Sequence, residues 1–249
     1  EHAIRGMRNP MNSWEKSDSK FFDDSEGHIC NISQGHGSMS LIEIGPNDHD
    51  LMMRLRNAGT DHRKFMRMIT VYLDITAPLY WWKEFDTYKV STVANSCSTM
   101  HKIHAKEFTL EDFSCEHLTV ESITFGLEPI IDILNKNREL YIQWENAGEE
   151  KKNLWWQMIQ LLPTSYNQKR TVMLNYEVLA NIYKSRRNHK LDEWHTLCDW
   201  IEELPYSELI TGEMVKNEVL TMSEYVNRKD IRDELYDADA ITMEGVKII

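Results

Sequence analysis

The sequence is short of positive charge and of long apolar stretches. Its 28 Lys and Arg residues are outnumbered by 40 Asp and Glu residues, which gives a formal net charge of −12. A chain of this charge repels a phosphate backbone unless its cations gather in one patch, so we expect no bulk nucleic-acid binding. No apolar run approaches the roughly 18 residues of a membrane helix, and no charged-then-apolar export signal lies near residue 1. We therefore expect a cytoplasmic protein without membrane contact.

Cysteine is also scarce, and the four cysteines have no CxxC spacing. A cytosolic chain of this size needs no disulfide, so we interpret all four as thiols. Cys97 is near Lys89, His101 and His104 in the sequence and is a candidate nucleophile if one of them lowers its pKa. An inert buried thiol is the interpretation that we favour.

Histidine and cysteine residues gather in two sets that soft-metal chemistry would suit. The sets are His101, His104, Cys115 and His117, and His28, Cys30 and His36. Neither has a recognised ligand spacing, and exposed loop histidines explain both. We predict no metal site.

The chain has 41% hydrophobic and 10% aromatic residues, which is enough for a core. It has no internal repeat, low-complexity tract or linker. We expect one α+β domain over residues 1–249, mainly helical with a small antiparallel sheet. Residues 1–40 are expected to be irregular apart from a short helix, residues 48–205 to form the core, and residues 211–249 to be an extension with an acidic stretch at 230–239.

Residue spacing predicts individual elements in the core. Apolar residues at every second position predict a strand over 69–75. Apolar residues three and four positions apart predict further helices. These helices begin at Asn47 or Asp48, at Pro78, at Ile130, at Glu149 and at Leu191. The polar stretch 86–101 needs no strand.

The run from Asn175 to Trp194 is the most informative segment. Asn175, Asn181 and Arg186 recur within a helical pattern whose buried stripe we assign to Val172, Val178, Leu179 and Ile182. The polar residues lie beside that stripe, where they would face a ligand or a partner subunit.

Three segments between Leu51 and Ile201 together carry a family resemblance. The first is 51–59, which ends in Arg-Asn-Ala-Gly and is followed by a strand and by Ala77-Pro78-Leu79-Tyr80. The second is Leu162-Pro163, and the third is Asn175, Asn181 and Arg186 with Trp194 beyond. Together they resemble the flavin-dependent thymidylate synthases, which methylate dUMP through a reduced FAD.

The resemblance implies a fold, cofactors and an assembly. In the family, methylene-tetrahydrofolate supplies the carbon, NADPH reduces the FAD, and the sites are shared between subunits of a homotetramer. The asparagines help to hold the flavin and the arginine contacts the pyrimidine. By resemblance, Asn175 and Asn181 would bind FAD, and Arg186 would bind the nucleotide.

The chain departs from the family at its signature motif. In the family this motif reads Arg-His-Arg-x-x-Ser-x-Asn-Glu-x-Ser-x-Arg-Tyr, where x is any residue. The stretch 87–100 keeps the length of this signature and loses most of its basic residues. Tyr88 replaces a flavin-gripping basic residue and Lys89 keeps a charge. Cys97 replaces the nucleotide-binding serine, Glu84 replaces a glutamine, and Ile159 replaces an arginine. Each lost charge-assisted hydrogen bond costs on the order of 1.5–3 kcal/mol, so dUMP binding should be much weaker than in the family.

Two functions follow from this comparison. In the first, the chain is a divergent flavin enzyme on a pyrimidine nucleotide, with Lys89, Asn95, Cys97 and Glu84 as replacement substrate contacts and Tyr88 beside the flavin. In the second, it is a non-catalytic member of the same fold that binds a nucleotide or another protein. We favour loss of ordinary thymidylate synthase activity, and no catalytic residue is identified.

Two further patterns bear on ligands. The most basic stretch is 184–190 with nearby Lys169 and Arg170, and a phosphate is expected there. The pairs Trp81-Trp82 and Trp155-Trp156 could stack on a ring, but core or subunit packing is favoured.

Overall fold

The computed structural model describes residues 1–23, 27–32, 39–145, 148–212, 241–243 and 246–248. It is mainly helical with small antiparallel sheets, as the α+β prediction requires. The helices are α1 (His2–Arg8), α2 (Pro46–Asn57), α3 (Leu79–Phe85), α4 (Thr99–Lys102), α5 (Val120–Ser122), α6 (Glu128–Gln143), α7 (Glu149–Leu161), α8 (Tyr176–Arg186), α9 (Asp192–Glu202) and α10 (Glu208–Thr211). The strands are β1 (Lys20–Asp23), β2 (His28–Cys30), β3 (Met39–Glu43), β4 (Thr70–Pro78), β5 (Val93–Ser96), β6 (Asn167–Asn175), β7 (Ile241–Met243) and β8 (Val246–Ile248).

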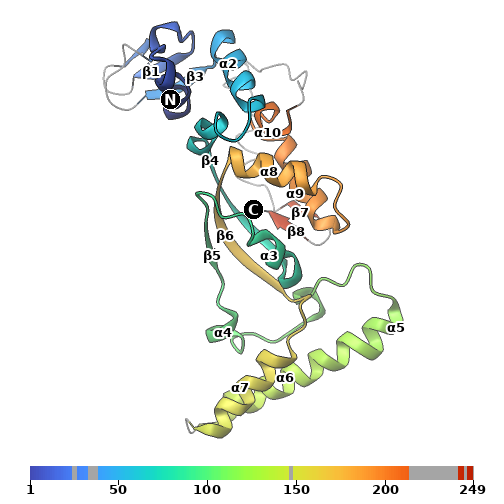
Figure 1. Cartoon of the computed structure of the whole chain (residues 1–249). Helices are drawn as coiled ribbons and strands as arrows, with labels where there is room; N and C mark the ends of the chain where they lie inside the picture. Colours follow the sequence, from blue (N-terminus) through green and yellow to red (C-terminus); the bar gives the residue numbers. More distant parts are fainter. Residues whose placement is uncertain (24–26, 33–38, 146–147, 213–240, 244–245, 249) are drawn as a thin grey trace.

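The molecule is elongated, with a sheet at its centre (Figure 1). The small sheet β2-β1-β3 and α1 lie at one end, and the α6–α7 pair projects from the other. Helices α3, α8 and α9 lie along one side of the central sheet. Among the described helices none is long and apolar enough to cross a membrane.

The central sheet has the order β5-β6-β4-β8-β7. The predicted strand over 69–75 is confirmed as β4, which pairs with β6 from Thr70↔Asn175 to Pro78↔Asn167. Leu73 and Ile75 are buried on the face that the helices cover, whereas Tyr72 on the opposite face is 71% exposed. Alternate burial therefore separates a helix-covered face from an open face.

Two assignments around this sheet are wrong. Val172, expected in the stripe of a helix, lies in β6 opposite Leu73, and α8 begins only at Tyr176. The stretch 86–101, expected to lack a strand, contains β5, which pairs with β6 at the sheet edge. All four residues of β5 are exposed, so no apolar alternation marks it in the sequence.

The N-terminal region is more regular than expected. The short helix near Ala3 is confirmed as α1, but residues 1–40 also supply β1 and β2 and the start of β3. Helix α2 is not capped by Asn47 or Asp48. Instead, the Asp18 carboxylate accepts the backbone N–H groups of Asn47 at 2.9 Å and Asp48 at 3.1 Å. This cap comes from a residue far along the chain, so local spacing cannot reveal it.

The other predicted helices are present as α3, α6, α7 and α9. Two hydrophobic clusters hold the elements together. The larger lies between the central sheet, α3, α8 and α9 and extends to the N-terminal elements, and the smaller lies between α6, α7 and the segment 103–113. The acidic stretch 230–239 lies outside the described residues, whereas β8 from the same extension pairs with β4.

Candidate functional site

Arg186, the predicted pyrimidine contact, lies at the centre of a polar cluster on the helix-covered side of the sheet. Its Nη1 donates to Glu84 Oε2 at 2.7 Å, and its Nε donates to the Tyr88 hydroxyl at 2.9 Å. The guanidinium carbon also lies 4.8 Å from the centre of the Trp194 ring. The last residue of α8 is thus joined to α3, to the segment after α3, and to α9.

Glu84 links the members of this cluster. The same Oε2 atom accepts the indole N–H of Trp194 at 3.0 Å and lies 3.5 Å from His189 Nε2. A carboxylate therefore pairs with Arg186 through Nη1 at the position where the resemblance gives a neutral glutamine. Any ligand that needs Arg186 has to compete with this ion pair.

Asn175, a predicted flavin contact, is completely buried. Its Oδ1 accepts the Val178 N–H at 3.0 Å and so caps α8. Its Nδ2 donates to the carbonyls of Val90 at 3.0 Å and Ser91 at 3.1 Å. Ser91 has a left-handed φ of 54°, so Asn175 fixes a strained loop next to β5.

Asn181, the second predicted flavin contact, faces a different neighbour. Its Oδ1 accepts from Arg63 Nη2 at 2.7 Å. Arg63 and Arg67 in turn flank the buried carboxylate of Glu177. In this chain the side chains of the two asparagines and Tyr88 make internal hydrogen bonds, and their contact with a flavin stays a prediction.

The other predicted substrate residues lie elsewhere. Asn95 stands opposite Thr171 in the β5–β6 register, and Thr171 stands opposite Asp74. Residues in one cross-strand row point to the same face, and this row belongs to the open face. The Cys97 N–H continues the ladder to the Lys169 carbonyl at 2.9 Å.

Lys89, Asn95 and Cys97 are all exposed. Within the described part of the chain, no hydrogen bond or ion pair joins their side chains to the Arg186 cluster. The structure therefore brings together Arg186, Glu84 and Tyr88 and leaves Lys89, Asn95 and Cys97 apart from them.

The basic stretch expected to bind a phosphate is largely paired with carboxylates. Lys169 bonds Asp74, Arg170 bonds Asp86, Arg186 bonds Glu84, and Arg187 bonds both Asp199 and Glu202. Positive charge that is already neutralised attracts an anion weakly. The phosphate expected at this stretch therefore meets few unpaired cations and stays a prediction.

The cysteine and histidine alternatives gain no support from the geometry. Among the described residues there is no group of three or more metal-ligating side chains, and His36 of the second set lies outside them. None of the four cysteines, all within described segments, is in a disulfide, and Cys97 is exposed rather than buried.

The tryptophan pairs divide between core and surface. Trp81 and Trp82 are buried, and Trp81 lies 4.6 Å from Trp194 between ring centres, so that pair belongs to the core. On α7, Trp156 is 38% exposed, and Trp155 donates its indole N–H to the Met100 carbonyl at 2.8 Å.

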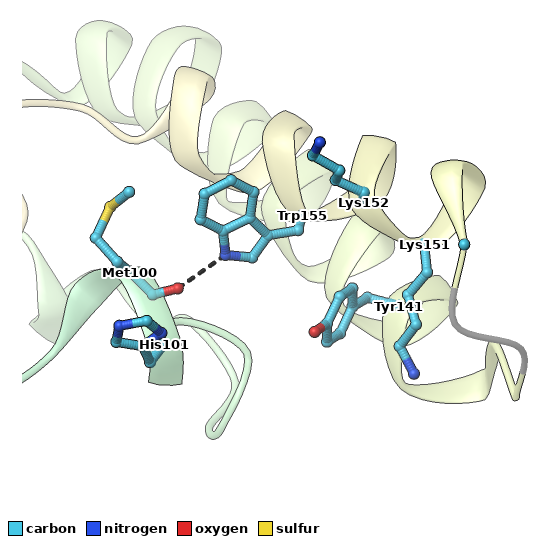
Figure 2. Close-up of a pocket in the computed structure, with 7 residues that line it drawn as sticks. Met100, His101, Tyr141, Lys151, Lys152 and Trp155 are labelled. Carbon is cyan, nitrogen blue, oxygen red and sulfur yellow. Dashed lines mark hydrogen bonds between the residues drawn. The ribbon is translucent and has the colours of Figure 1, made fainter.

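Trp155 lines a hollow that the sequence analysis missed (Figure 2). The hollow lies between α4, α6 and α7, with a volume of about 320 Å³. Its lining residues include Met100, His101, Tyr141, Lys151, Lys152 and Trp155. The only sequence signal was the proximity of Lys151-Lys152 to the tryptophan pair.

Comparison with known proteins bears on the fold. No protein-family model matches the chain, and no curated protein matches its sequence. Two solved structures of the flavin-dependent thymidylate synthase ThyX from Helicobacter pylori, both with FAD and dUMP, are similar to it. The first has a TM-score of 0.55 at 16% identity, over 85% of this chain and 93% of that one. The second has a TM-score of 0.54 at 16% identity, over 85% and 92%. At this identity the likeness is one of fold: the chain is an α+β protein whose fold resembles that of the flavin-dependent thymidylate synthases.

Proposed function

We propose that this chain is a nucleotide-binding protein on the flavin-dependent thymidylate synthase fold that does not methylate dUMP. The observation that carries the loss of dUMP methylation is the ion pair between Glu84 and Arg186 at 2.7 Å. The side chains are 35% and 17% exposed, so water screens the pair only in part. Displacing a charged hydrogen bond costs about 1.5–3 kcal/mol, or roughly ten- to a hundredfold in affinity.

Nucleotide binding is supported by the fold, because both similar structures contain dUMP. Loss of methylation is supported by the signature segment, where most of the family's basic residues are missing. FAD, NADPH and methylene-tetrahydrofolate belong to the second candidate function, a divergent flavin enzyme. The observation that favours the second candidate is that both similar structures also contain FAD.

The two candidates differ in colour and in product. Under the proposal, purified protein has no visible flavin absorbance, binds no added FAD, and forms no dTMP when dUMP, FAD, NADPH and methylene-tetrahydrofolate are supplied. A flavin band that responds to dUMP, or any dTMP above background, would overturn the proposal and support the flavin enzyme.

Glu84→Gln tests the ion pair directly, because glutamine is the residue that the resemblance gives at this position. In the natural chain we expect dUMP to leave the NMR signal of the Trp194 indole N–H unchanged. In Glu84→Gln the freed Arg186 should bind dUMP and shift that signal. Asp86→Asn, which removes the carboxylate on Arg170 in the same region, is the matched control and should behave like the natural chain. An equal dUMP response at Trp194 in natural and variant protein would contradict the role of Glu84.

We further propose that the chain assembles with copies of itself in the cytoplasm. The resemblance to the flavin-dependent thymidylate synthases implies a tetramer. Arg186 lies on the covered side of the sheet, and Asn95 on the open face, so only a second copy could place both at one site. Large apolar side chains are also exposed around α5 and α6: Val120, Phe125, Ile133, Leu140 and Ile142. Burial of such a surface between subunits would stabilise an assembly.

A further inference from the structure

The hollow between α4, α6 and α7 lies away from the Arg186 cluster. Figure 1 shows α4, α6 and α7 at the end of the molecule opposite α1, whereas α8 and α9 lie beside the central sheet. The walls come from His101 on α4, Tyr141 on α6, and Lys151, Lys152 and Trp155 on α7. Figure 2 shows Trp155 and Tyr141 on one side of the hollow, with His101 across from them. The amino groups of Lys151 and Lys152 point in opposite directions, and that of Lys151 lies beside Tyr141.

Positive charge at this hollow is not neutralised. Lys151 Nζ donates to the Trp144 carbonyl at 2.7 Å and lies 4.9 Å from the centre of the Tyr141 ring. Over the residues that the structure describes, neither Lys151 nor Lys152 forms an ion pair with a carboxylate, although Glu149 and Glu150 precede them. This contrasts with Arg170, Arg186 and Arg187, all of which are paired.

A histidine behind the hollow responds to the same charge. The pKa of His104 is lowered, first by burial and then by the positive charges of Lys102, Lys151 and Arg138. Its ring lies 4.7 Å from that of Tyr141, and its Nδ1 is buried without a hydrogen-bond partner in the described structure. Lys102, Lys151 and Arg138 therefore place positive charge around the same imidazole. A bound anion would offset the repulsion between these charges and a protonated His104.

The aromatic walls are held in place. The indole of Trp155 is fixed by its bond to the Met100 carbonyl at 2.8 Å, which joins α7 to α4. Arg138 Nε donates to the His104 carbonyl at 3.0 Å and joins α6 to the segment that follows α4. A rigid ring binds a planar ligand at a smaller entropy cost than a mobile one.

We propose that this hollow binds a nucleoside monophosphate, with the base against Trp155 and Tyr141 and the phosphate on Lys151. The volume of about 320 Å³ is near the lower end of the roughly 300–1,000 Å³ range of small-molecule sites, which suits one base and one phosphate rather than a dinucleotide. The inference rests on the proposed nucleotide binding and gives it a location in the natural chain.

The test is calorimetric titration of the full chain with UMP, uridine and inorganic phosphate, together with NMR of the Trp155 indole N–H. UMP should bind more tightly than either fragment and shift the Trp155 signal. Lys151→Gln should weaken UMP binding about tenfold or more, whereas Lys152→Gln should weaken it little, because the amino group of Lys152 points away from the rings (Figure 2). Lys136→Gln, an exposed lysine of α6 outside the hollow, is the matched control and should leave the affinity unchanged. Trp155→Phe should weaken binding, and its neighbour Trp156→Phe should not.

The pKa of His104 provides a second readout, because a bound phosphate favours the protonated ring and should raise that pKa. If UMP binds with neither the Trp155 signal nor Lys151→Gln responding, nucleotide binding stands and this location is wrong. Tight binding of phosphate alone with no contribution from the base would also overturn the proposed ligand. Absence of any UMP binding would overturn both this inference and the nucleotide-binding function.

Discussion

At the scale of single residues, the side chains that the sequence marks for a ligand mostly make internal contacts. Asn175 caps α8 and holds the carbonyls of Val90 and Ser91, and Arg186 bonds Glu84 and Tyr88. A polar residue beside an apolar stripe has two physical explanations, a ligand or a buried partner. Spacing alone does not separate them, because both require the same residue types.

The cysteines offer a residue-scale prediction. Burial raises the pKa of the Cys198 thiol to about 12, so roughly one thiol in ten thousand is ionised at pH 8. Cys97 is exposed and should react quickly with a thiol reagent, whereas Cys198 should react only when the chain unfolds. The measurement is labelling with time, with the modified residues identified by mass spectrometry. Cys97→Ser should remove the fast phase, and its persistence would refute this assignment.

The same pKa sets the direction of a pH effect on stability. The Cys198 thiol titrates near 9 when unfolded and near 12 when folded. Below pH 9 both states are protonated and its contribution to folding is fully present. Above pH 9 the unfolded state loses the proton first, so that contribution to the free energy of unfolding falls as the pH rises. Cys198→Ala should reduce this decline in urea titrations between pH 8 and 10.

At the scale of elements, the start of α2 depends on a close backbone approach. A Cβ added to Gly45 would lie 2.2 Å from the Asp18 Cγ and 2.5 Å from the Asp18 carbonyl carbon. Gly45→Ala should therefore push away the carboxylate that caps Asn47 and Asp48 and cost about 1–3 kcal/mol of stability. Urea denaturation measures this as a lower midpoint at an unchanged slope.

Gly126→Ala is the control for Gly45→Ala. It lies in the π-helical turn Ile123–Leu127, and no neighbouring atom lies within 4 Å of an added Cβ. Gly126→Ala should keep or slightly raise the midpoint, since alanine loses less backbone entropy on folding. If both variants lost stability equally, the contact between Gly45 and Asp18 would not be the cause.

At the scale of the whole molecule, the exposed apolar side chains around α5 and α6 predict self-association. Phe125 is 80% exposed, and Phe125→Asp would place a charge in any interface that buries it. We expect natural protein to sediment as an oligomer and Phe125→Asp to shift it toward the monomer. Ile29→Asp, at the opposite end of the molecule and 63% exposed, is the control. A monomeric natural protein would contradict the prediction.

The elements that can be predicted from the sequence are those whose residue pattern is local. The helices α6, α7 and α9 and the strand β4 have strong apolar periodicity and were found. The other strands, β1, β2, β3, β5, β6, β7 and β8, are not predicted from the sequence. In two of them the reason is visible: β5 has no buried face, and β6 carries Lys169 and Arg170 beside its apolar residues. The organisation as a single domain stays a prediction.

The candidate site divides in the same way. The amino-acid sequence by itself determined the α+β class and the segments that resemble the flavin-dependent thymidylate synthases. These features depend on the spacing of apolar residues and on the positions of glycine and proline, which shape the backbone of their own segment. Only the tertiary structure decided that Glu84 closes on Arg186, that Asn95 stands on the other face, and that Lys151, which has no carboxylate partner among the described residues, meets aromatic rings at one hollow. These pairings join residues far apart in the chain, and packing of the elements, rather than local spacing, brings such side chains within bonding distance.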